Sequence, residues 1–125
     1  MARILVIDDN AANLDLMLYL LRAFGHQPQG VTDGVEGYEA ARSGEFALVL
    51  ADILMPGIDG YELARRLKKD DRVGSTPLVA VTALAMTKDL ERMRDAGFNG
   101  YITKPIEPTT FVSQVEHHLR RDGRV

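Results

Sequence analysis

Five polar residues of the chain each come directly after, or at the end of, a short apolar run: Asp8, Asp9, Asp52, Thr82 and Lys104. Carboxylates that lie close together repel one another, and a bound cation or a raised pKa is the usual resolution. Oxygen ligands without His or Cys favour a hard ion such as Mg²⁺, with Mn²⁺ as an alternative, and Mg²⁺ often bridges to phosphate. An ammonium and a hydroxyl suit phosphoryl oxygens. One carboxylate then remains as a nucleophile that would form an acyl phosphate.

Asp52 is the centre of this hypothesis. It ends the apolar run 46–51 and precedes a Met-Pro-Gly segment that disfavours further strand, since Pro lacks a donor and Gly favours turns. A charge at the end of a buried strand usually belongs to a site. Taken singly, each residue has a plainer interpretation: an Asp opens turns, an acid pair starts a helix, a threonine caps one and a surface lysine is solvated. Only their meeting at one place favours a site.

The elements that would position these residues alternate along the chain. Short apolar runs predict strands over 4–7, 27–31, 46–51, 77–82 and 98–103. Between them and after the last, apolar residues recur at helical spacing: Leu14, Met17, Leu18 and Leu21; Val35, Tyr38 and Ala41; Leu63 and Leu67; Leu90, Met93 and Ala96; Phe111, Val115 and Leu119.

Helix boundaries follow from local capping signals. Asn10 or Asn13 is expected to cap the first helix, and Thr87 the fourth. Capping boxes are expected at Asp33-x-x-Glu36 and Asp59-x-x-Glu62. Glu107-Pro108 is expected to start the last helix, with Pro in the first turn. The predicted stops are glycines, at Gly25, Gly44 and Gly97.

This alternation predicts the fold class. Strands alternating with helices imply parallel pairing through right-handed crossovers, with helices on both faces of the sheet. The apolar character of the first, third and fourth strands fits central positions, whereas Pro28 places the second strand at an edge. We therefore expect an α/β protein with a doubly wound five-stranded parallel sheet and five helices. Its ligand site should lie beyond the carboxyl ends of the strands, where the five polar residues would meet.

The composition limits the function classes. At 125 residues, with 46% hydrophobic and 26% charged residues, the chain fits one soluble domain, 1–125, with a core of about 3–121. The net charge of −3 argues against nucleic-acid binding, and the absence of cysteine excludes disulfides and thiolate chemistry. No apolar run approaches the roughly 18 residues of a membrane span, and the first residues are too acidic for a signal peptide. We therefore expect a cytoplasmic protein.

Four segments, in order and spacing, resemble the receiver domain (CheY-like) of two-component response regulators over essentially the whole chain: 7–10, 50–60, 81–83 and 101–105. The resemblance implies a flavodoxin-like fold with strand order 2-1-3-4-5. It also implies a signalling domain rather than an enzyme, one that catalyses only its own Mg²⁺-dependent phosphorylation and slow dephosphorylation.

The resemblance also implies a role for each site residue. Asp52 would accept a phosphoryl group from a phosphohistidine of a histidine kinase or a histidine phosphotransfer protein. Asp8, Asp9, Asp52 and the backbone carbonyl of Leu54 would hold Mg²⁺. The phosphoryl group would be bound by Thr82, the Ala83 amide and Lys104, and the Lys104–Pro105 bond would be cis.

A switch and a signalling surface are part of the same resemblance. Thr82 would move toward the phosphoryl group and Tyr101 would turn inward, changing the face built from the fourth helix, fifth strand and fifth helix. A downstream partner or effector domain would meet that face, and the plainer interpretation of Tyr101 is a half-buried strand aromatic. Leu54 and Leu84 occupy positions that tune water access in the family, and their apolar character predicts a long-lived phosphoaspartate, unless both merely shield the rim.

Several alternatives stay open or are disfavoured. A haloacid-dehalogenase-like phosphatase needs a second acid two residues after the nucleophile, where this chain has Leu54. No glycine-rich nucleotide-binding motif follows the first strand. A receiver-like scaffold that binds partners without phosphorylation remains the alternative. We expect a stand-alone regulator, and the alternative interpretation is the leading domain of a longer protein. We also expect a monomer, and dimerisation through the switching face on phosphorylation stays open.

Overall fold

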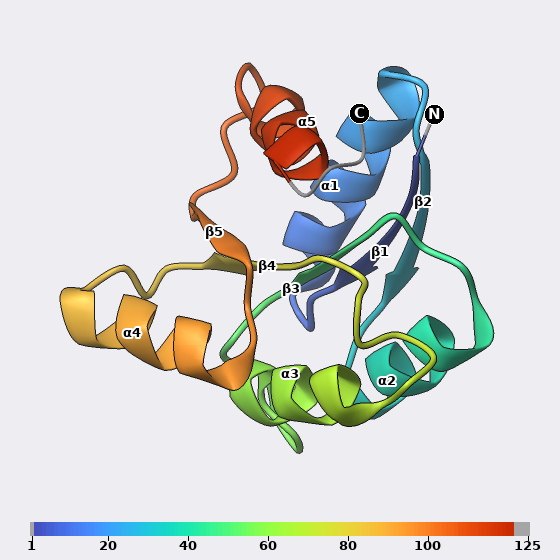
Figure 1. Cartoon of the computed structure of the whole chain (residues 1–125). Coiled ribbons are helices and arrows are strands. Elements are labelled where there is room, and N and C mark those ends of the chain that lie inside the picture. The colour runs from blue at the N-terminus through green and yellow to red at the C-terminus, as the bar shows by residue number, and fades with distance from the viewer. Residues whose placement is uncertain (1, 122–125) are drawn as a thin grey trace.

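The structure of the protein is a computed structural model that describes residues 2–121, and within them the chain forms a five-stranded parallel sheet (Figure 1). Its strands are β1 (Arg3–Ile7), β2 (Gln27–Val31), β3 (Leu48–Ala51), β4 (Leu78–Thr82) and β5 (Gly100–Thr103). They lie in the order β2-β1-β3-β4-β5. The prediction of a doubly wound sheet in this order is confirmed, and the strand that contains Pro28 lies at an edge, as predicted.

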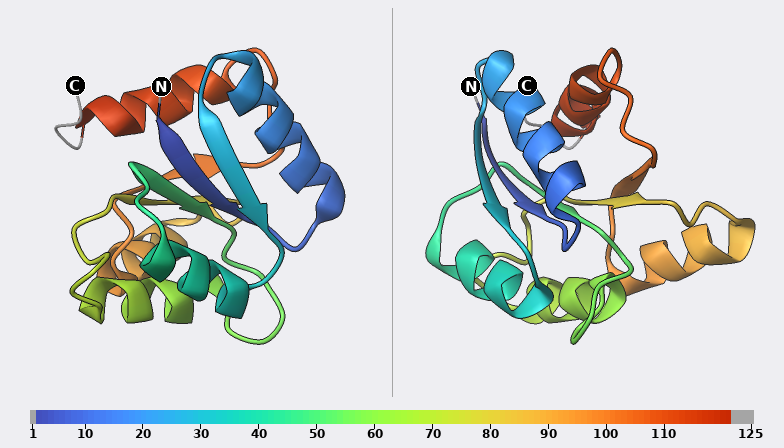
Figure 2. Two further views of the ribbon diagram at one scale, coloured as in Figure 1. Left: turned by 90° about the vertical axis from the view of Figure 1, so that its right-hand side faces the viewer. Right: turned by 180° about the vertical axis from the view of Figure 1, so that it is seen from behind.

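Helices cover both faces of the sheet. They are α1 (Ala11–Ala23), α2 (Gly34–Ser43), α3 (Gly60–Lys69), α4 (Thr87–Ala96) and α5 (Phe111–Arg121). Helices α1 and α5 lie on one face, and α2, α3 and α4 lie on the other (Figure 2). None of the helices within residues 2–121 combines the length and the apolar character that crossing a membrane requires.

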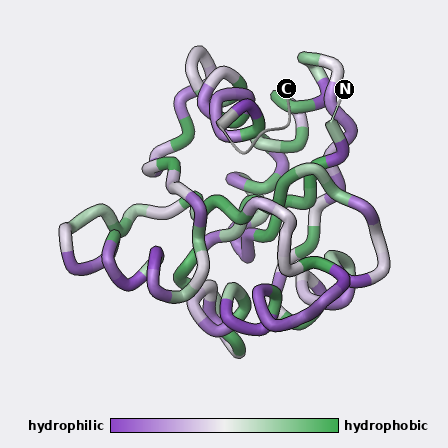
Figure 3. The backbone as a smooth tube through the Cα atoms, viewed as in Figure 1, coloured by the Kyte–Doolittle hydropathy of each residue, from purple (hydrophilic) through white to green (hydrophobic). Residues whose placement is uncertain are grey.

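The two faces have separate hydrophobic cores, because successive side chains of a strand point to opposite sides. In β1, Leu5 and Ile7 pack in the core under α2, α3 and α4. Ile4 and Val6 pack in the core under α1 and α5. Figure 3 shows hydrophobic residues on the central strands and hydrophilic stretches on α3 and α4.

Three predicted helix caps are present. The side chain of Asn10 accepts a hydrogen bond from the Asn13 amide at 2.9 Å. Asp33 and Asp59 accept in the same way from the amides three residues later. The reciprocal half of each expected capping box is replaced by another contact, since Glu36 accepts from Thr32 and the Glu62 carboxylate pairs with two arginines, Arg65 and Arg66.

Two predicted helix starts are wrong. Thr87 is the first residue of α4 and not its cap, which is Met86, whose amide donates to the Asp89 carboxylate at 3.2 Å. The last helix begins at Phe111 rather than at Glu107-Pro108. A turn at 108–110 comes first, and the Glu107 carbonyl accepts hydrogen bonds from Thr110 and Phe111.

Val35 does not lie on the buried face of its helix, as the periodicity predicted, but is 58% exposed. The buried positions of α2 are Gly34, Gly37 and Ala41. Gly37 lies so close to β1 that a Cβ there would be 2.6 Å from Ile7 Cδ1. The helix therefore meets the sheet through Gly37, and Val35 lies on its exposed side.

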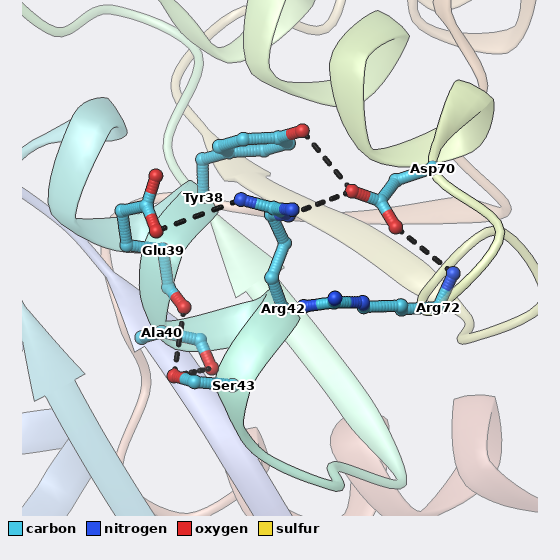
Figure 4. A network of polar contacts seen from close by, with 7 residues as sticks. All are labelled: Tyr38, Glu39, Ala40, Arg42, Ser43, Asp70 and Arg72. Atoms are coloured by element: carbon cyan, nitrogen blue, oxygen red, sulfur yellow. Dashed lines mark hydrogen bonds and ion pairs between the residues drawn. The ribbon is translucent and has the colours of Figure 1, made fainter.

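Asp70 links the end of α3 to α2 (Figure 4). Its Oδ2 accepts hydrogen bonds from Arg42 Nε at 2.8 Å and from the Tyr38 hydroxyl at 3.1 Å. Its Oδ1 accepts from the Arg72 amide at 2.9 Å. The Arg72 amide, followed by the Tyr38 and Arg42 side chains, lowers the pKa of the Asp70 carboxyl against the opposing effect of burial.

We expect Asp70→Asn to destabilise the protein at neutral pH and to have a much smaller effect at about pH 3. Because the pKa of Asp70 is lower in the fold than in the unfolded chain, its ionised form stabilises the protein above the unfolded pKa. That contribution is lost as the pH falls through the folded pKa. Urea midpoints at both pH values measure it, with the exposed neighbour Asp71→Asn as the control. An equal loss at both pH values would contradict the prediction.

His26 ties α5 to the start of the chain. Its Nδ1 accepts a hydrogen bond from the Ala2 amide at 3.2 Å, and its Nε2 lies 2.8 Å from Glu116 Oε2. These partners are 24 and 90 positions away in the sequence. His26 therefore links the last helix to Ala2, the residue before β1.

Candidate functional site

The carboxyl ends of four strands supply the polar residues of the candidate site. Asp8 follows β1 and Asp52 follows β3, and the two strands are neighbours in which Ile7 pairs with Ala51. Thr82 is the last residue of β4, and Lys104 follows β5. Parallel strands end at the same edge of a sheet, so the fold brings these side chains to one rim.

Lys104 binds two of the carboxylates. Its Nζ lies 3.0 Å from Asp52 Oδ2, with which it forms a hydrogen bond, and 3.0 Å from Asp8 Oδ2. Asp8 is fully buried and Asp52 is 7% exposed. Two nearly buried carboxylates therefore share one ammonium group.

Backbone amides hold the other carboxylate oxygens. Asp8 Oδ1 accepts from the Asn10 amide at 2.9 Å, and Asp52 Oδ1 accepts from the Leu54 amide at 3.4 Å. Asp8 Oδ2 is buried, and among the described residues it has the ion pair with Lys104 but no well-aligned hydrogen bond. This oxygen thus has unused capacity to accept a further ligand.

The charges of the site are strongly coupled. Burial raises the pKa of Asp52, the hydrogen bond and charge of Lys104 oppose this, and the nearby Asp8 adds to the rise. Burial alone would lower the pKa of Lys104, but its contacts with Asp8 and Asp52 outweigh burial and raise it. The lysine is therefore held in its charged form, while two carboxylates compete for it.

The three acids form a group that could hold a metal ion. One carboxylate oxygen from each of Asp8, Asp9 and Asp52 lies within 4.8 Å of the others. Asp9 is exposed, so the group opens to solvent on one side. An all-oxygen donor set with a buried, under-used oxygen on Asp8 fits a hard divalent cation such as Mg²⁺.

The remaining predicted residues lie at or just after the same strand ends, apart from Tyr101, which lies within β5. Thr82 is buried and its Oγ1 accepts from the Leu84 amide at 3.1 Å, which leaves its hydroxyl proton available. Ala83 is exposed, and the Lys104–Pro105 peptide bond is cis. Leu54 is exposed and Leu84 is half-buried. Tyr101 is exposed on β5, at the far edge of the sheet.

Sequence reasoning missed two residues that shape the site. The Asn10 amide orients Asp8 while its side chain caps α1, and its position directly after the acid pair was the available signal. Gly60 starts α3 against the end of β3, where a Cβ would be 2.5 Å from the Asp52 carbonyl oxygen. A glycine in the first turn of a helix, directly after its Asp cap, was the signal for this close approach.

The sequence matches the model of the response regulator receiver domain over residues 4–116. The chain belongs to this family. The receiver domain is similar to the polar-differentiation response regulator DivK of Brucella anthropi, with 35% identity over 116 residues, which are 93% of this chain and 94% of that protein.

Solved structures of receiver domains share the fold. A CheY-like receiver domain protein from Methanospirillum hungatei has a TM-score of 0.89 and 27% identity, covering 99% of this chain and 98% of that one. The receiver domain of a sensor histidine kinase from Pseudomonas aeruginosa has a TM-score of 0.85 and 28% identity, covering 98% of both chains. That structure has a magnesium ion coordinated in its active site cleft.

Proposed function

We propose that this receiver domain accepts a phosphoryl group on Asp52 from a phosphohistidine, in a Mg²⁺-dependent step. The donor would be a histidine kinase or a histidine phosphotransfer protein. The observation that carries the proposal is the placement of Asp52, nearly buried between Asp8 and Lys104 at the carboxyl end of a central strand. A carboxylate that merely ends a strand does not require a second acid and a shared, half-buried ammonium beside it.

The transfer would be a nucleophilic displacement at phosphorus. An Asp52 carboxylate oxygen attacks, a new phosphorus–oxygen bond forms, the phosphorus–nitrogen bond to the donor histidine breaks, and the imidazole leaves with its electron pair. Asp8, Asp9, Asp52 and the Leu54 carbonyl would hold Mg²⁺, which supplies positive charge beside the phosphoryl oxygens. The grouping of the three acids within 4.8 Å at this rim and the magnesium in the similar Pseudomonas receiver domain support this assignment.

Three groups of this chain would bind the transferred phosphoryl group. Lys104 has a compact charge within reach of Asp52 and would turn from the carboxylate to a phosphoryl oxygen. The Thr82 hydroxyl and the Ala83 amide lie at the end of the neighbouring strand, where they would donate to the other oxygens. These donors would replace the ionic contacts that Asp52 makes before the reaction.

The bound phosphoryl group would also drive a switch. Thr82 would give up its contact with the Leu84 amide and move toward the phosphoryl group. Tyr101, now exposed on β5, would turn inward and change the face made by α4, β5 and α5 for a downstream partner or effector domain. This is a two-state element biased by a local charge event.

The phosphoaspartate is expected to be long-lived. Leu54 and Leu84, two residues after Asp52 and Thr82, present no polar group that would orient an attacking water. Replacing both leucines with Asn and Glu, respectively, should therefore shorten the half-life of the isolated phosphorylated domain by about tenfold, the scale of one weak positioning contact. Decay of the label in both proteins measures this. A wild-type half-life of seconds would show that the leucines only shield the rim.

The main test is labelling of the wild type and of Asp52→Asn by a small-molecule phosphodonor and by a histidine phosphotransfer protein, with and without Mg²⁺. We expect Mg²⁺-dependent labelling of the wild type and none of the variant. Asp71→Asn, an exposed acid remote from the rim in sequence, is the control. Unlabelled wild type with both donors would favour a scaffold that binds partners without phosphorylation. The proposal places the domain in the cytoplasm, where such donors act.

A further inference from the structure

The outer side of α1 carries exposed apolar side chains that the phosphoryl site does not use. Tyr19 is 68% exposed, and Phe24, at the C-terminal end of the helix, is 63% exposed. A surface hollow of about 470 Å³ lies beside Tyr19, and its lining residues are Asp15, Leu18, Tyr19, Arg22 and Ala23. Figure 2 shows this helix at the outside of the molecule, next to the edge strand β2.

Two side chains of opposite charge lie at the two ends of this hollow. Asp15 and Arg22 are seven positions apart, which is about two turns, so both lie on the same side of the helix. Leu18 and Tyr19 lie midway between them. Among the described residues, neither Asp15 nor Arg22 has a hydrogen bond or ion pair with another side chain. Along the helix, this face therefore has an acidic residue, then an apolar centre at Leu18 and Tyr19, and then a basic residue.

We propose that this face binds a second copy of the chain, with the two α1 helices antiparallel. A two-fold axis through the midpoint between Leu18 and Tyr19 brings Asp15 opposite Arg22 of the second copy, and Arg22 opposite Asp15 of the second copy. Both charges of each copy are then paired, and each Tyr19 packs against the hollow of the other. Such a self-complementary patch is what a two-fold interface requires.

The charge pattern favours a second copy in this orientation over other arrangements. A parallel pair of helices would place like charges together. A partner of unrelated sequence would not, in general, have opposite charges at the spacing of Asp15 and Arg22. An exposed tyrosine at the centre of a patch is a common anchor of interfaces. One helix pair buries less than the roughly 1,600 Å² of a standard interface, so the dimer is weak and forms only at high concentration.

This surface is separate from the proposed switching face. Helix α1 packs on β2, β1 and α5, but the residues that line the hollow all belong to α1, and β5 lies at the opposite edge of the sheet from β2. A dimer through the hollow therefore leaves α4 and β5 of the switching face open to a partner. It also does not require phosphorylation, which distinguishes it from dimerisation through the switching face.

Sedimentation velocity of the full chain over a range of concentrations, without phosphodonor, tests the proposal. The average mass should rise from 13.8 kDa toward twice that value as the concentration increases. Asp15→Arg and Arg22→Asp should each weaken self-association by at least about tenfold, because both pairs become repulsive. Asp95→Arg, at an exposed position of α4, is the control and should have no effect.

Mixing the two variants gives the decisive result. Asp15→Arg has two positive charges on the face and Arg22→Asp has two negative ones, so a mixed pair restores attraction at both positions. We expect the mixture to associate at least as tightly as the wild type, while each variant alone stays monomeric. The proposal would be overturned if the wild type remained monomeric up to about 1 mM. It would also be overturned if the mixture did not associate while both variants kept their helical circular dichroism.

Discussion

Replacing Lys104 with Met should lower the free energy of unfolding of the metal-free protein by about 2–4 kcal/mol. This is slightly less than the roughly 3–5 kcal/mol of removing one partner from a buried ion pair, because the Lys104 side chain is 16% exposed. Lys104 is the ammonium that Asp8 and Asp52 share, and both acids are nearly buried. Without it, two carboxylates remain close together with no counter-charge. Burial and the Asp8 charge already raise the pKa of Asp52, and Lys104 opposes that rise, so its removal should raise the pKa of Asp52 further.

Magnesium should rescue this variant more than it stabilises the wild type. The ammonium and a metal ion compete for the same carboxylates, so removing the lysine leaves more negative charge for the ion and raises its affinity. Thermal unfolding with and without Mg²⁺ measures both effects. Lys88→Met, which removes an exposed lysine of α4, is the control. Equal Mg²⁺ shifts for the wild type and Lys104→Met would contradict a metal site at these acids.

Gly60→Ala is expected to have the second large effect, a loss of about 2–3 kcal/mol of stability from overpacking. A Cβ at this position would lie 2.5 Å from the Asp52 carbonyl oxygen and 2.7 Å from Ile53 Cα. The Gly60 amide also donates to the Ile53 carbonyl at 2.8 Å, which holds the backbone segments together. Alanine is intrinsically the better helix former by about 1 kcal/mol, so the change would stabilise α3 if the contact were absent.

The effect of Gly60→Ala should reach the proposed phosphoryl site. Displacing the Asp52 backbone by a few tenths of an ångström would misplace its carboxylate. We therefore expect slower phosphorylation and a lower urea concentration at the unfolding midpoint. Gly34→Ala is a matched control, because Gly34 also starts a helix after an Asp cap and a Cβ there would be 2.8 Å from the Ile58 carbonyl oxygen. Gly34→Ala should lose stability but keep a normal phosphorylation rate relative to the folded fraction.

The sheet could be predicted from the sequence because a strand that is buried on both faces consists of a continuous run of apolar residues. The apolar runs at Ile4–Ile7 and Leu78–Val81 admit few other structures, and Pro28 restricts its strand to an edge. The meeting of the polar residues also followed, since parallel strands end at one rim. The sequence could suggest that Lys104 lies near Asp52, and the structure brings them together at 3.0 Å.

Other features could not be predicted because they depend on contacts between distant segments. Periodicity placed Val35 with the buried residues, but the close approach of Gly37 to Ile7 turns that side of α2 outward. Thr87 is a good cap by residue type, yet the Asp89 carboxylate binds the Met86 amide and moves the start of the helix. No local sequence pattern indicates that two acids share Lys104 or that His26 contacts Glu116, because the partners are far apart in the sequence.

The place of α5 in the fold has a consequence for the synthesis of the protein. Phe111, Val112, Val115 and Leu119 cover the core that contains Ile4 and Val6 of β1. Strand β1 is synthesised before α5, so this core stays open and His26 stays apart from Glu116 until α5 has left the ribosome. Until then the nascent chain exposes an apolar sheet face, the kind of surface that binds chaperones or aggregates. Slow translation of the segment that forms α5 should prolong this exposure, since chain growth proceeds at about 5–20 residues per second.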